Sequence, residues 1–376
     1  MLNKTFFLMF VFLSLIFNVH IALASTLSDS LEKAWHLIEI EKYDDAILLC
    51  DKLINDYPDN SLIYAYRARA YGKKGDDNKV LFDCNKALSL DPDNTLALYL
   101  RGICYLDMGD YEISLSDIDK AISLKPSWSW PYNAKGLLFQ EKGDHHKAII
   151  EFSKGIGLDP NSSNDYVQRG LSYFEIKDLD LAMADFIKAI ELDPENSFAF
   201  CDRGRVYLVL GQYNKALSDF NKALIISPKF TECYVNKGYL FEKLKEYVRS
   251  LSAYSDAIEI DPNSAYAYYG RGIVLYELNK FKESVTDFNK VLELDPDFAE
   301  KTVYLYRGCS FYYLEQYNKA VQDFNEYLKI HPNDNKAQRF RFYSIIFSYG
   351  LYAIGVILGI ITVLVIIYIK RFRKST

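Results

Sequence analysis

The chain repeats itself with a period of 34 residues, and no other feature limits its fold as strongly. A proline stands at Pro58 and recurs every 34 residues as far as Pro296, and Pro332 follows after 36 more. With each proline numbered 32, position 8 of every unit is alanine or glycine: Ala34, Ala68, Gly102, Gly136, Gly170, Gly204, Gly238, Gly272 and Gly308. A fixed period of this length is typical of stacked repeats, and the sequence holds nine of them.

The residues of one unit, 197–228, predict two helices joined by a tight turn. Two segments of about a dozen residues each carry apolar residues at helical spacing, and a polar break at 211–213 separates them. Small residues at Gly204 and Ala216 let the two helices cross closely. The closing proline cannot continue a helical hydrogen-bond ladder. Because one hairpin cannot bury both of its apolar faces, successive units are expected to stack.

This unit resembles the tetratricopeptide repeat in the residues at its fixed positions, which are Phe200, Arg203, Gly204, Tyr207, Ala216, Phe220 and Ala223. The resemblance covers about four fifths of the chain. It implies an all-α fold, a right-handed superhelical solenoid of nine helix-turn-helix repeats. The repeats are expected at 27–58, 61–92, 95–126, 129–160, 163–194, 197–228, 231–262, 265–296 and 301–332. One transmembrane helix is expected to follow the solenoid.

Residues 1–24 are predicted to be a signal peptide. Lys4 supplies a positive start, residues 6–17 form a nearly unbroken apolar run, and Ala-Leu-Ala at 22–24 matches a small-residue cleavage site. An uncleaved signal anchor is the alternative interpretation. Both interpretations place the repeats on the far side of a membrane.

Residues 343–369 contain no charged residue and are long enough to span a bilayer with some tilt. Residues 333–342 are then a linker or capping helix, and 370–376 a basic cytoplasmic tail. With the leader, this predicts a single-pass membrane protein whose repeat domain is extracytoplasmic, that is, periplasmic, extracellular or luminal. A tail-anchored protein with cytosolic repeats is the alternative. Gly355 and Gly359 form a GxxxG pair, which allows a homodimer through the membrane helix.

Composition and motifs argue against nucleic-acid binding and against catalysis. Without Lys4 and the four cations of the tail, 39 basic residues stand against 50 acidic ones, so no nucleic-acid partner is expected. The chain has no HExxH, phosphate-binding loop, CxxC or nucleophile elbow. We therefore predict no catalytic residue, no metal and no cofactor. Of the six cysteines only Cys201 and Cys233 suggest a pair, and few disulfides or none are expected.

Features that recur in most repeats are interpreted as architectural. Arg or Lys at position 7, from Arg67 to Arg307, and Asp at position 23 predict a charge ladder between helices. In the family, positions 2, 5, 9 and 12 of the first helices face the inner, concave side. At these positions the candidate partner-binding residues are Trp130, Asn133, Arg205, Tyr239, Glu242, Tyr266, Tyr269, Tyr276 and Tyr312. Tyrosine suits an extended peptide or a partner helix; alternatively, these rings pack between neighbouring repeats.

These features predict a non-catalytic scaffold that binds peptide or helix partners in its groove and assembles an envelope or secretory-pathway complex. A groove receptor for glycan or cell-wall fragments is one alternative, and an enzyme is another. Some family members bind acidic chaperone C-termini through a Lys and Asn clamp at positions 5 and 9. This chain lacks that set; its second repeat, for example, has Ala65 and Arg69 there. No ligand held mainly through a carboxylate is therefore expected.

Overall fold

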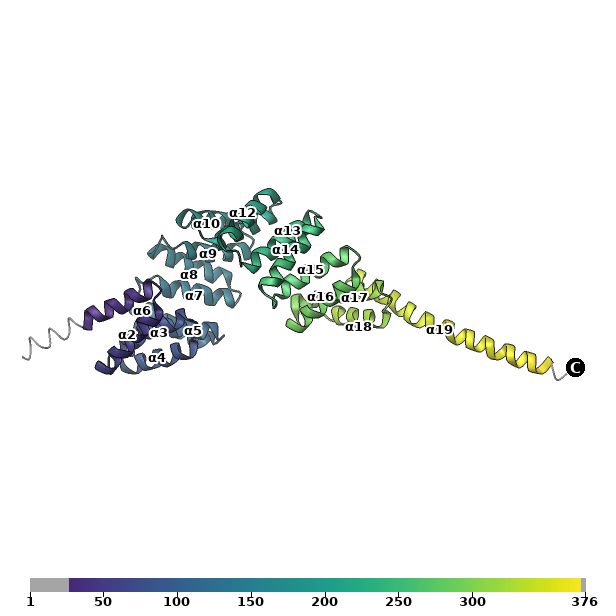
Figure 1. Cartoon of the computed structure of the whole chain (residues 1–376), viewed down its shortest axis with the longest axis horizontal. Helices are drawn as coiled ribbons and strands as arrows, with labels where there is room; N and C mark the ends of the chain where they lie inside the picture. Colours follow the sequence, from purple (N-terminus) through teal and green to yellow (C-terminus); the bar gives the residue numbers. More distant parts are fainter. Residues whose placement is uncertain (1–26, 373–376) are drawn as a thin grey trace, which may run out of the picture. The chain divides into compact units, whose positions relative to one another are not determined.

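The computed structural model describes residues 27–372, with the side chains of all but 299, 300, 351–355, 357 and 367–372. Apart from one short 3₁₀ helix, every element in this part of the chain is an α-helix (Figure 1). The chain divides into two compact units, one ending at Pro194 and the other beginning at Glu195. The predicted signal peptide at 1–24 lies outside the described residues, as does the end of the basic tail, 373–376.

The first unit consists of antiparallel helix pairs, each within one of the predicted repeats. Residues 27–39 are helical. The following helices are α2 (Tyr43–Asp56), α3 (Ser61–Lys73), α4 (Asp77–Leu90), α5 (Thr95–Asp107), α6 (Tyr111–Leu124), α7 (Trp130–Glu141), α8 (His145–Leu158), α9 (Ser163–Glu175) and α10 (Leu179–Leu192). Figure 1 shows α7, α8 and α9 side by side in chain order.

The second unit continues the same pattern and ends in a long helix. Its elements are α11 (Ser197–Val209), α12 (Tyr213–Ile226), α13 (Thr231–Lys243), α14 (Tyr247–Ile260), α15 (Ala265–Glu277), α16 (Phe281–Leu294), the 3₁₀ helix η1 (Phe298–Lys301), α17 (Thr302–Tyr313), α18 (Tyr317–Leu328) and α19 (Asn335–Phe372). The all-α repeat architecture predicted from the period is confirmed.

The small residue at position 8 is required by an aromatic ring of the same repeat. A Cβ atom added to Gly204 would lie 2.7 Å from Cε1 of Phe220, which is fully buried. In other repeats the aromatic ring at this position also packs against glycine, for example Phe288 against Gly272. Real Cβ atoms do not come so close to carbon, so glycine here lets the second helix insert its ring against the backbone of the first.

The turns and helix starts are also set locally. Gly211, between α11 and α12, has φ of 70°, a left-handed conformation that glycine adopts without steric cost. The carboxylate of Asp144 accepts a hydrogen bond from the backbone N–H of Lys147 at 3.1 Å and caps α8. Asn196 caps α11 in the same way through the N–H of Ala199.

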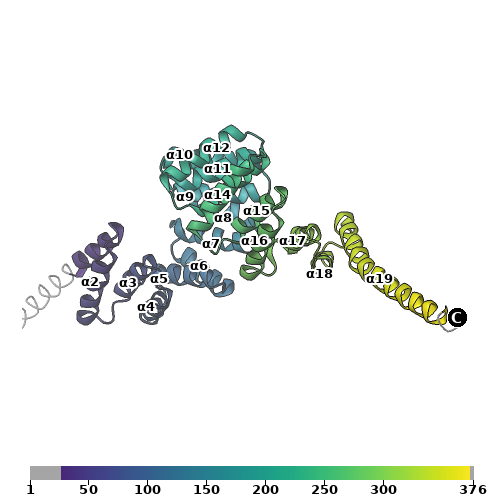
Figure 2. The same cartoon turned by 45° about the vertical axis from the view of Figure 1, so that its right-hand side comes forward.

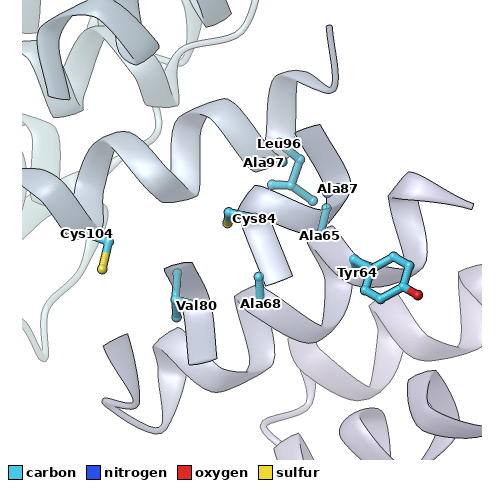
Figure 3. Close-up of a cluster of buried hydrophobic side chains, with 9 residues drawn as sticks. All are labelled: Tyr64, Ala65, Ala68, Val80, Cys84, Ala87, Leu96, Ala97 and Cys104. Atoms are coloured by element: carbon cyan, nitrogen blue, oxygen red, sulfur yellow. The ribbon is translucent and has the colours of Figure 1, made fainter. Parts of the chain in front are cut away.

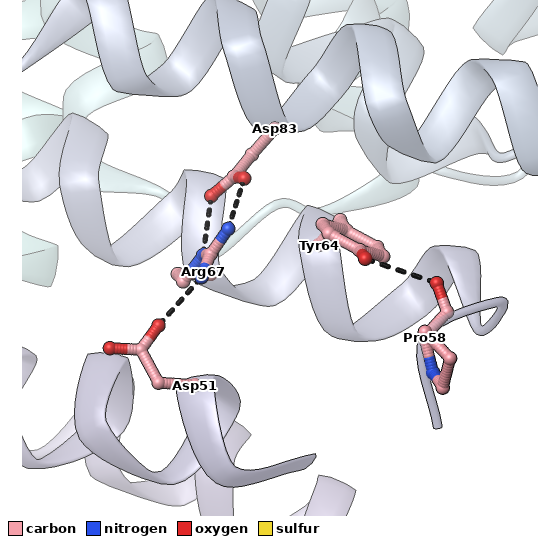
Figure 4. Close-up of polar contacts among 5 residues, drawn as sticks. All are labelled: Asp51, Pro58, Tyr64, Arg67 and Asp83. Carbon is pink, nitrogen blue, oxygen red and sulfur yellow. Dashed lines mark hydrogen bonds and ion pairs between the residues drawn. The ribbon is translucent and has the colours of Figure 1, made fainter. Parts of the chain in front are cut away.

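The predicted charge ladder is present, and it joins consecutive repeats as well as the two helices of one repeat. Arg67 donates from Nε and Nη2 to the two carboxylate oxygens of Asp83, at 2.8 and 2.6 Å (Figure 4). Its Nη1 donates to Asp51 of the preceding repeat at 2.6 Å. The other bidentate pairs within repeats are Arg101–Asp117, Arg169–Asp185, Arg203–Asp219, Arg271–Asp287 and Arg307–Asp323.

The cysteines belong to the core. All six are buried and free. Cys84 packs among Tyr64, Ala68 and Val80, where most repeats have an aromatic ring (Figure 3). Burial raises the pKa of the Cys50 thiol to about 12, so this thiol stays protonated and unreactive at neutral pH.

The start of α19 caps the solenoid. Ala337 and Ser344 are fully buried, and Phe340 joins the core of the last repeat around Phe324. Arg341 lies 34 residues after Arg307, and its Nη1 donates to Asn325 at 3.2 Å. The first turns of α19 therefore take the place of the first helix of a further repeat. Figure 2 shows α19 as one continuous helix.

The prediction of a transmembrane helix at 343–369 is corrected by the structure. Among the residues it describes, no helix combines the length and the apolar character needed to cross a bilayer. The predicted span begins where α19 is still docked on the repeats, because Ser344 is buried and the ring of Phe347 stacks 5.3 Å from that of Tyr317. Further along, the described side chains from 358 to 366 are exposed.

The predictions that depended on this span are corrected with it. These are the single-pass membrane location, the extracytoplasmic repeats with a cytoplasmic tail, and the homodimer through Gly355 and Gly359. The expected role in an envelope or secretory-pathway complex is not tested by the described residues and stays a prediction.

Candidate binding site

The three tryptophans of the chain lie together in the first unit, although they come from two distant repeats. Trp35 belongs to the first repeat, Trp130 begins the fourth, and Trp128 lies in the turn just before it. The rings of Trp35 and Trp130 are nearly parallel, with centroids 6.4 Å apart and planes at 19°. The ring of Trp128 lies 5.5 Å from that of Trp130. The stacking of the repeats thus brings all the indoles of the protein into one cluster.

The guanidinium group of Arg69 packs against two of these rings. Its Cζ is 4.4 Å from the ring centroid of Trp35 and 4.3 Å from that of Trp130. Tyr66 packs against Trp35 at 5.3 Å, and Tyr99 packs against Trp130 at 5.8 Å. A cation close to two indole rings is attracted by both ring quadrupoles. We call Trp35, Arg69, Tyr99, Trp128 and Trp130 the tryptophan cluster.

Arg69 differs electrostatically from the ladder arginines. Hydrogen bonds from Arg67 to Asp83 raise the pKa of Arg67 above its ordinary value. Burial lowers the pKa of Arg69, and its Nε is buried without a hydrogen-bond partner. A guanidinium remains charged at neutral pH even so. The tryptophan cluster therefore holds a partly desolvated cation.

A cavity of about 420 Å³ opens beside the tryptophan cluster. Its lining comes from α3, α4, α5 and α7 and from the start of α9. Among the lining residues are Arg69, Lys73, Asp77, Tyr99, Asp107, Trp130, Asn133 and Asp165. This volume is in the range of small-ligand pockets, about 300 to 1,000 Å³. The cavity combines aromatic walls with charges of both signs.

The polar groups of the cavity are held in defined states. Asn133 donates from Nδ2 to Oδ1 of Asp165 at 2.7 Å, and the side chain of Asp165 is buried. Burial raises the pKa of Asp165, while its hydrogen bond with Ser162 acts in the opposite direction. Burial raises the pKa of Tyr99 to about 12, so its hydroxyl is protonated at neutral pH. Fixed donors and acceptors of this kind suit a peptide backbone.

The structure brings two predicted site residues, Trp130 and Asn133, into this cavity, and the others lie in the second unit. There, two predicted tyrosines stay accessible: Tyr239 is 41% exposed and Tyr266 67% exposed. The ring of Tyr239 packs against the ammonium group of Lys243 at 4.7 Å, and that of Tyr266 edge-on against Phe298 at 4.8 Å.

The three other predicted tyrosines pack between neighbouring elements. The hydroxyl of Tyr269 donates to Oγ1 of Thr302 at 3.2 Å. The ring of Tyr276 lies 5.9 Å from that of Tyr306 in the next repeat. The ring of Tyr312 lies 5.2 Å from Phe340, on the capping part of α19. These contacts fit the alternative interpretation, in which the rings pack between neighbouring repeats.

The two charged residues predicted in the second unit are engaged within the chain. Arg205 donates from Nη1 to Asp202 at 2.9 Å. Glu242 accepts a hydrogen bond from the hydroxyl of Tyr254 at 3.3 Å, and burial raises its pKa. The Arg205 bond lies within α11, and the Glu242 bond joins α13 to α14.

Several residues of the site were missed by the sequence reading. Trp35 and Arg69 stand at position 9 and Tyr99 at position 5, which are inner-face positions. The scarcity of tryptophan, three residues in 376, was the available signal. The position of a residue within its repeat does not show that residues from the first and fourth repeats meet. For metals, no group of three or more His, Cys, Asp or Glu side chains lies together in the part of the chain described.

Stacked helix pairs, a small residue where each pair crosses, and an aromatic cavity formed mainly by first helices define a helical-repeat solenoid. The chain belongs to the tetratricopeptide repeat family. Models described as tetratricopeptide repeat or TPR repeat match residues 84–115, 131–162, 166–196, 197–230, 243–279, 265–298 and 302–334. The family recognised from the repeat is thereby confirmed. No curated protein matches the chain significantly.

Solved structures share the fold at low sequence identity. The structure of the APC/C hetero-tetramer Cut9-Hcn1 has a TM-score of 0.63 at 18% identity, over 75% of this chain and 55% of that one. The chain thus spans about half the length of that relative. A tetratricopeptide repeat protein from Parabacteroides merdae ATCC 43184 has a TM-score of 0.51 at 19% identity, over 67% of this chain and 98% of that one. At such identities the likeness concerns the fold alone.

Proposed function

We propose that this protein is a non-catalytic protein-interaction scaffold that binds an extended peptide or helix of a partner protein on the face formed by the first helices of its repeats. We call this face the first-helix face. Its membership in the tetratricopeptide repeat family supports the proposal, because repeat solenoids create extended binding surfaces. The single observation that carries it is the cavity beside the tryptophan cluster.

The lining of the cavity is suited to a peptide. Trp130 and Tyr99 supply aromatic walls, and large aromatic groups contribute much of the binding energy in protein interfaces. The Asn133–Asp165 pair offers acceptor and donor groups within reach of a backbone. An extended segment bound here would bury its side chains against rings and satisfy its amides on fixed polar groups.

In the second unit we propose Tyr239 and Tyr266 as contacts to a partner, since both rings are exposed. Tyr269, Tyr276 and Tyr312 contribute by holding neighbouring repeats and α19 in place. Of the five tyrosines predicted in this unit, we therefore propose only Tyr239 and Tyr266 as contacts to a partner.

A glycan receptor is disfavoured by the packing of the indoles. Sugars bind to proteins by stacking on a free aromatic face. The rings of Trp35 and Trp130 instead pack close to each other, with centroids 6.4 Å apart, and both contact the guanidinium group of Arg69. The protein-scaffold proposal needs only the cavity and the ring edges.

The proposal is tested by affinity capture with the full chain and matched variants. Trp130→Ala removes a wall of the cavity. We expect it to lower the affinity for a captured partner by at least about tenfold, the usual cost of losing an aromatic hot spot. Phe82→Ala is the control, because Phe82 lies on the second helix of its repeat and is 69% exposed. Equal binding by parent and Trp130→Ala, or loss with Phe82→Ala alone, contradicts a site on the first-helix face.

A further inference from the structure

Two buried cysteines of the second unit meet across neighbouring repeats. Cys201 lies on α11 and Cys233 on α13, the first helices of the sixth and seventh repeats. The exposed fractions of the two residues are 1% and 0%. The thiol of Cys201 is hydrogen-bonded to that of Cys233. Both are free thiols in this structure, so the pair is in its reduced form.

A second contact gives the same arrangement independently. Nδ2 of Asn236 donates to Sγ of Cys201 at 3.6 Å. Asn236 follows Cys233 by three residues on α13, and residues at this spacing share one face of a helix. Cys201 therefore packs against the face of α13 that carries both Cys233 and Asn236.

The surroundings of the two sulfurs differ. The S–H of Cys233 donates to the backbone carbonyl of Phe220 at 3.6 Å. The hydrogen bond with Cys233 and burial raise the pKa of Cys201, whereas the side-chain amide of Asn236 acts in the opposite direction. An N–H donor stabilises a thiolate more than a thiol. Cys201 is therefore the sulfur that is better prepared to act as a nucleophile.

We infer that Cys201 and Cys233 form a reversible disulfide under oxidising conditions and so join the sixth repeat to the seventh. This inference goes beyond the proposed function, because it concerns the covalent state of the chain and not its partner. Sulfurs at hydrogen-bonding distance need mainly a rotation of their side chains to reach the S–S bond length of about 2.05 Å. These two residues are also the one pair that the sequence suggests.

Hydrogen peroxide is the oxidant in this step, since a small molecule can reach a buried pair when the repeats open locally. The thiolate of Cys201 attacks one peroxide oxygen, the O–O bond breaks, and Cys201 becomes a sulfenic acid. The thiolate of Cys233 then attacks the sulfenic sulfur, so that the S–S bond forms and hydroxide leaves. The two thiols together lose two electrons and two protons, and the peroxide becomes two water molecules. A thiol reductant restores the pair by disulfide exchange.

The disulfide acts on the proposed binding face. Both α11 and α13 belong to the first-helix face, and a covalent bond between them limits how far the two repeats can move relative to each other. A cross-link also reduces the conformational freedom of the unfolded chain. Oxidation is therefore expected to stiffen this part of the face and to stabilise the second unit.

Peptide mapping of the full chain tests the inference directly. The reduced chain is treated with hydrogen peroxide under native conditions, and the remaining thiols are blocked with iodoacetamide in denaturant. Trypsin then places Cys201 in the peptide 189–203 and Cys233 in the peptide 230–237. We expect mass spectrometry to find these two peptides joined, with the loss of two hydrogen atoms, and to find them separate after treatment with dithiothreitol.

The matched control is the pair Cys50 and Cys84, which also lie in adjacent repeats and are buried and free. We expect both to be recovered as blocked thiols. The inference is overturned if the native chain gives no link between 189–203 and 230–237 at a peroxide concentration that oxidises the unfolded chain. It is also overturned if Cys50 and Cys84 are joined in equal yield, because oxidation would then not depend on the contact.

Asn236→Ala tests the positioning role of the amide. Without this donor the Cys201 thiolate is less stable, so the pH profile of the cross-linking rate is expected to shift to higher pH. A role in packing alone would leave the profile where it is, and an unshifted profile contradicts the assignment of Asn236. Far-UV circular dichroism shows whether the variant is still helical. If it is not, the mapping of the parent chain decides the inference.

Thermal unfolding measures the effect of the bond. The melting temperature of the second unit is expected to rise by about 5 °C or more on oxidation of the parent chain. Cys201→Ser, treated in the same way, should show no rise. A cross-linked parent chain that melts no higher than the reduced chain would contradict the expected stabilisation.

Discussion

The guanidinium carbon of Arg69 lies 4.3 Å from the ring centre of Trp130, although the two residues belong to the second and fourth repeats. Repeat solenoids usually derive their stability from contacts between neighbours. Here a contact that skips a repeat forms the wall of the cavity. The same stacking that stabilises the first unit therefore also shapes its candidate binding site.

The first prediction concerns the charge ladder. Asp219→Ala leaves the partly buried guanidinium of Arg203 without the carboxylate that now lies 2.8 Å away. We expect the free energy of unfolding to fall by about 2 kcal/mol, because a desolvated charge loses its partner. Denaturant unfolding measures this.

The matched control for the ladder is Asp119→Ala. It removes the half-exposed partner of Lys135 at 2.7 Å, and it should change the free energy by less than about 1 kcal/mol. Equal effects of the two variants would contradict a structural role for the buried ladder.

The second prediction concerns the glycine at the helix crossing. Gly204→Ala places a methyl group 2.7 Å from the ring of Phe220, and we expect a loss of about 1 to 3 kcal/mol from overpacking. Gly157→Ala is the control, since a Cβ there meets nothing within 4 Å and Gly157 lies within α8. It should stabilise by about 0.5 to 1 kcal/mol through helix propensity. In thermal unfolding, Gly204→Ala is expected to lower the melting temperature and Gly157→Ala to raise it.

The third prediction concerns the capping role of α19. Phe340→Ala removes a ring that lies 5.2 Å from Tyr312 and 6.0 Å from Phe324. We expect destabilisation of the second unit by about 2 to 4 kcal/mol. Phe342→Ala, on the same helix but 59% exposed, should change stability by less than about 0.5 kcal/mol. Hydrogen exchange of α17 and α18 reports the difference, and unchanged exchange with Phe340→Ala would refute the cap.

The fourth prediction concerns pH. Burial raises the pKa of Asp202 to about 6, an effect that outweighs the opposite effect of Arg205. A carboxyl whose pKa is higher in the folded state stabilises the fold below its unfolded pKa, about 3.9. That contribution is lost as pH rises through about 6. The stability of the parent relative to Asp202→Asn should therefore fall between about pH 4 and 6; a constant difference would show that the pKa is not raised.

The repeat architecture could be predicted from the sequence because its causes are local. Gly204 and Phe220 recur at fixed positions, and each pair acts within one hairpin. The contacts of Arg69 with both Trp35 and Trp130 depend instead on how several repeats turn relative to one another, which no single repeat encodes. For the same reason, position alone did not separate the exposed Tyr266 from Tyr276, which packs on the next repeat.

The end of the chain shows another limit. An uncharged run looks the same in sequence whether its first turns dock on a repeat or not. The contacts of Ser344 and Phe347 with the last repeat become visible only when the spacing from Arg307 to Arg341 is recognised as one more repeat period.

The most direct test of the account is hydrogen–deuterium exchange of the full chain with and without a bound partner. Protein binding on the first-helix face predicts slower exchange in the peptides of α3, α5 and α7, around Arg69, Tyr99 and Trp130, with the second helices α4, α6 and α8 little changed. Slower exchange confined to α4, α6 and α8 would contradict the central claim.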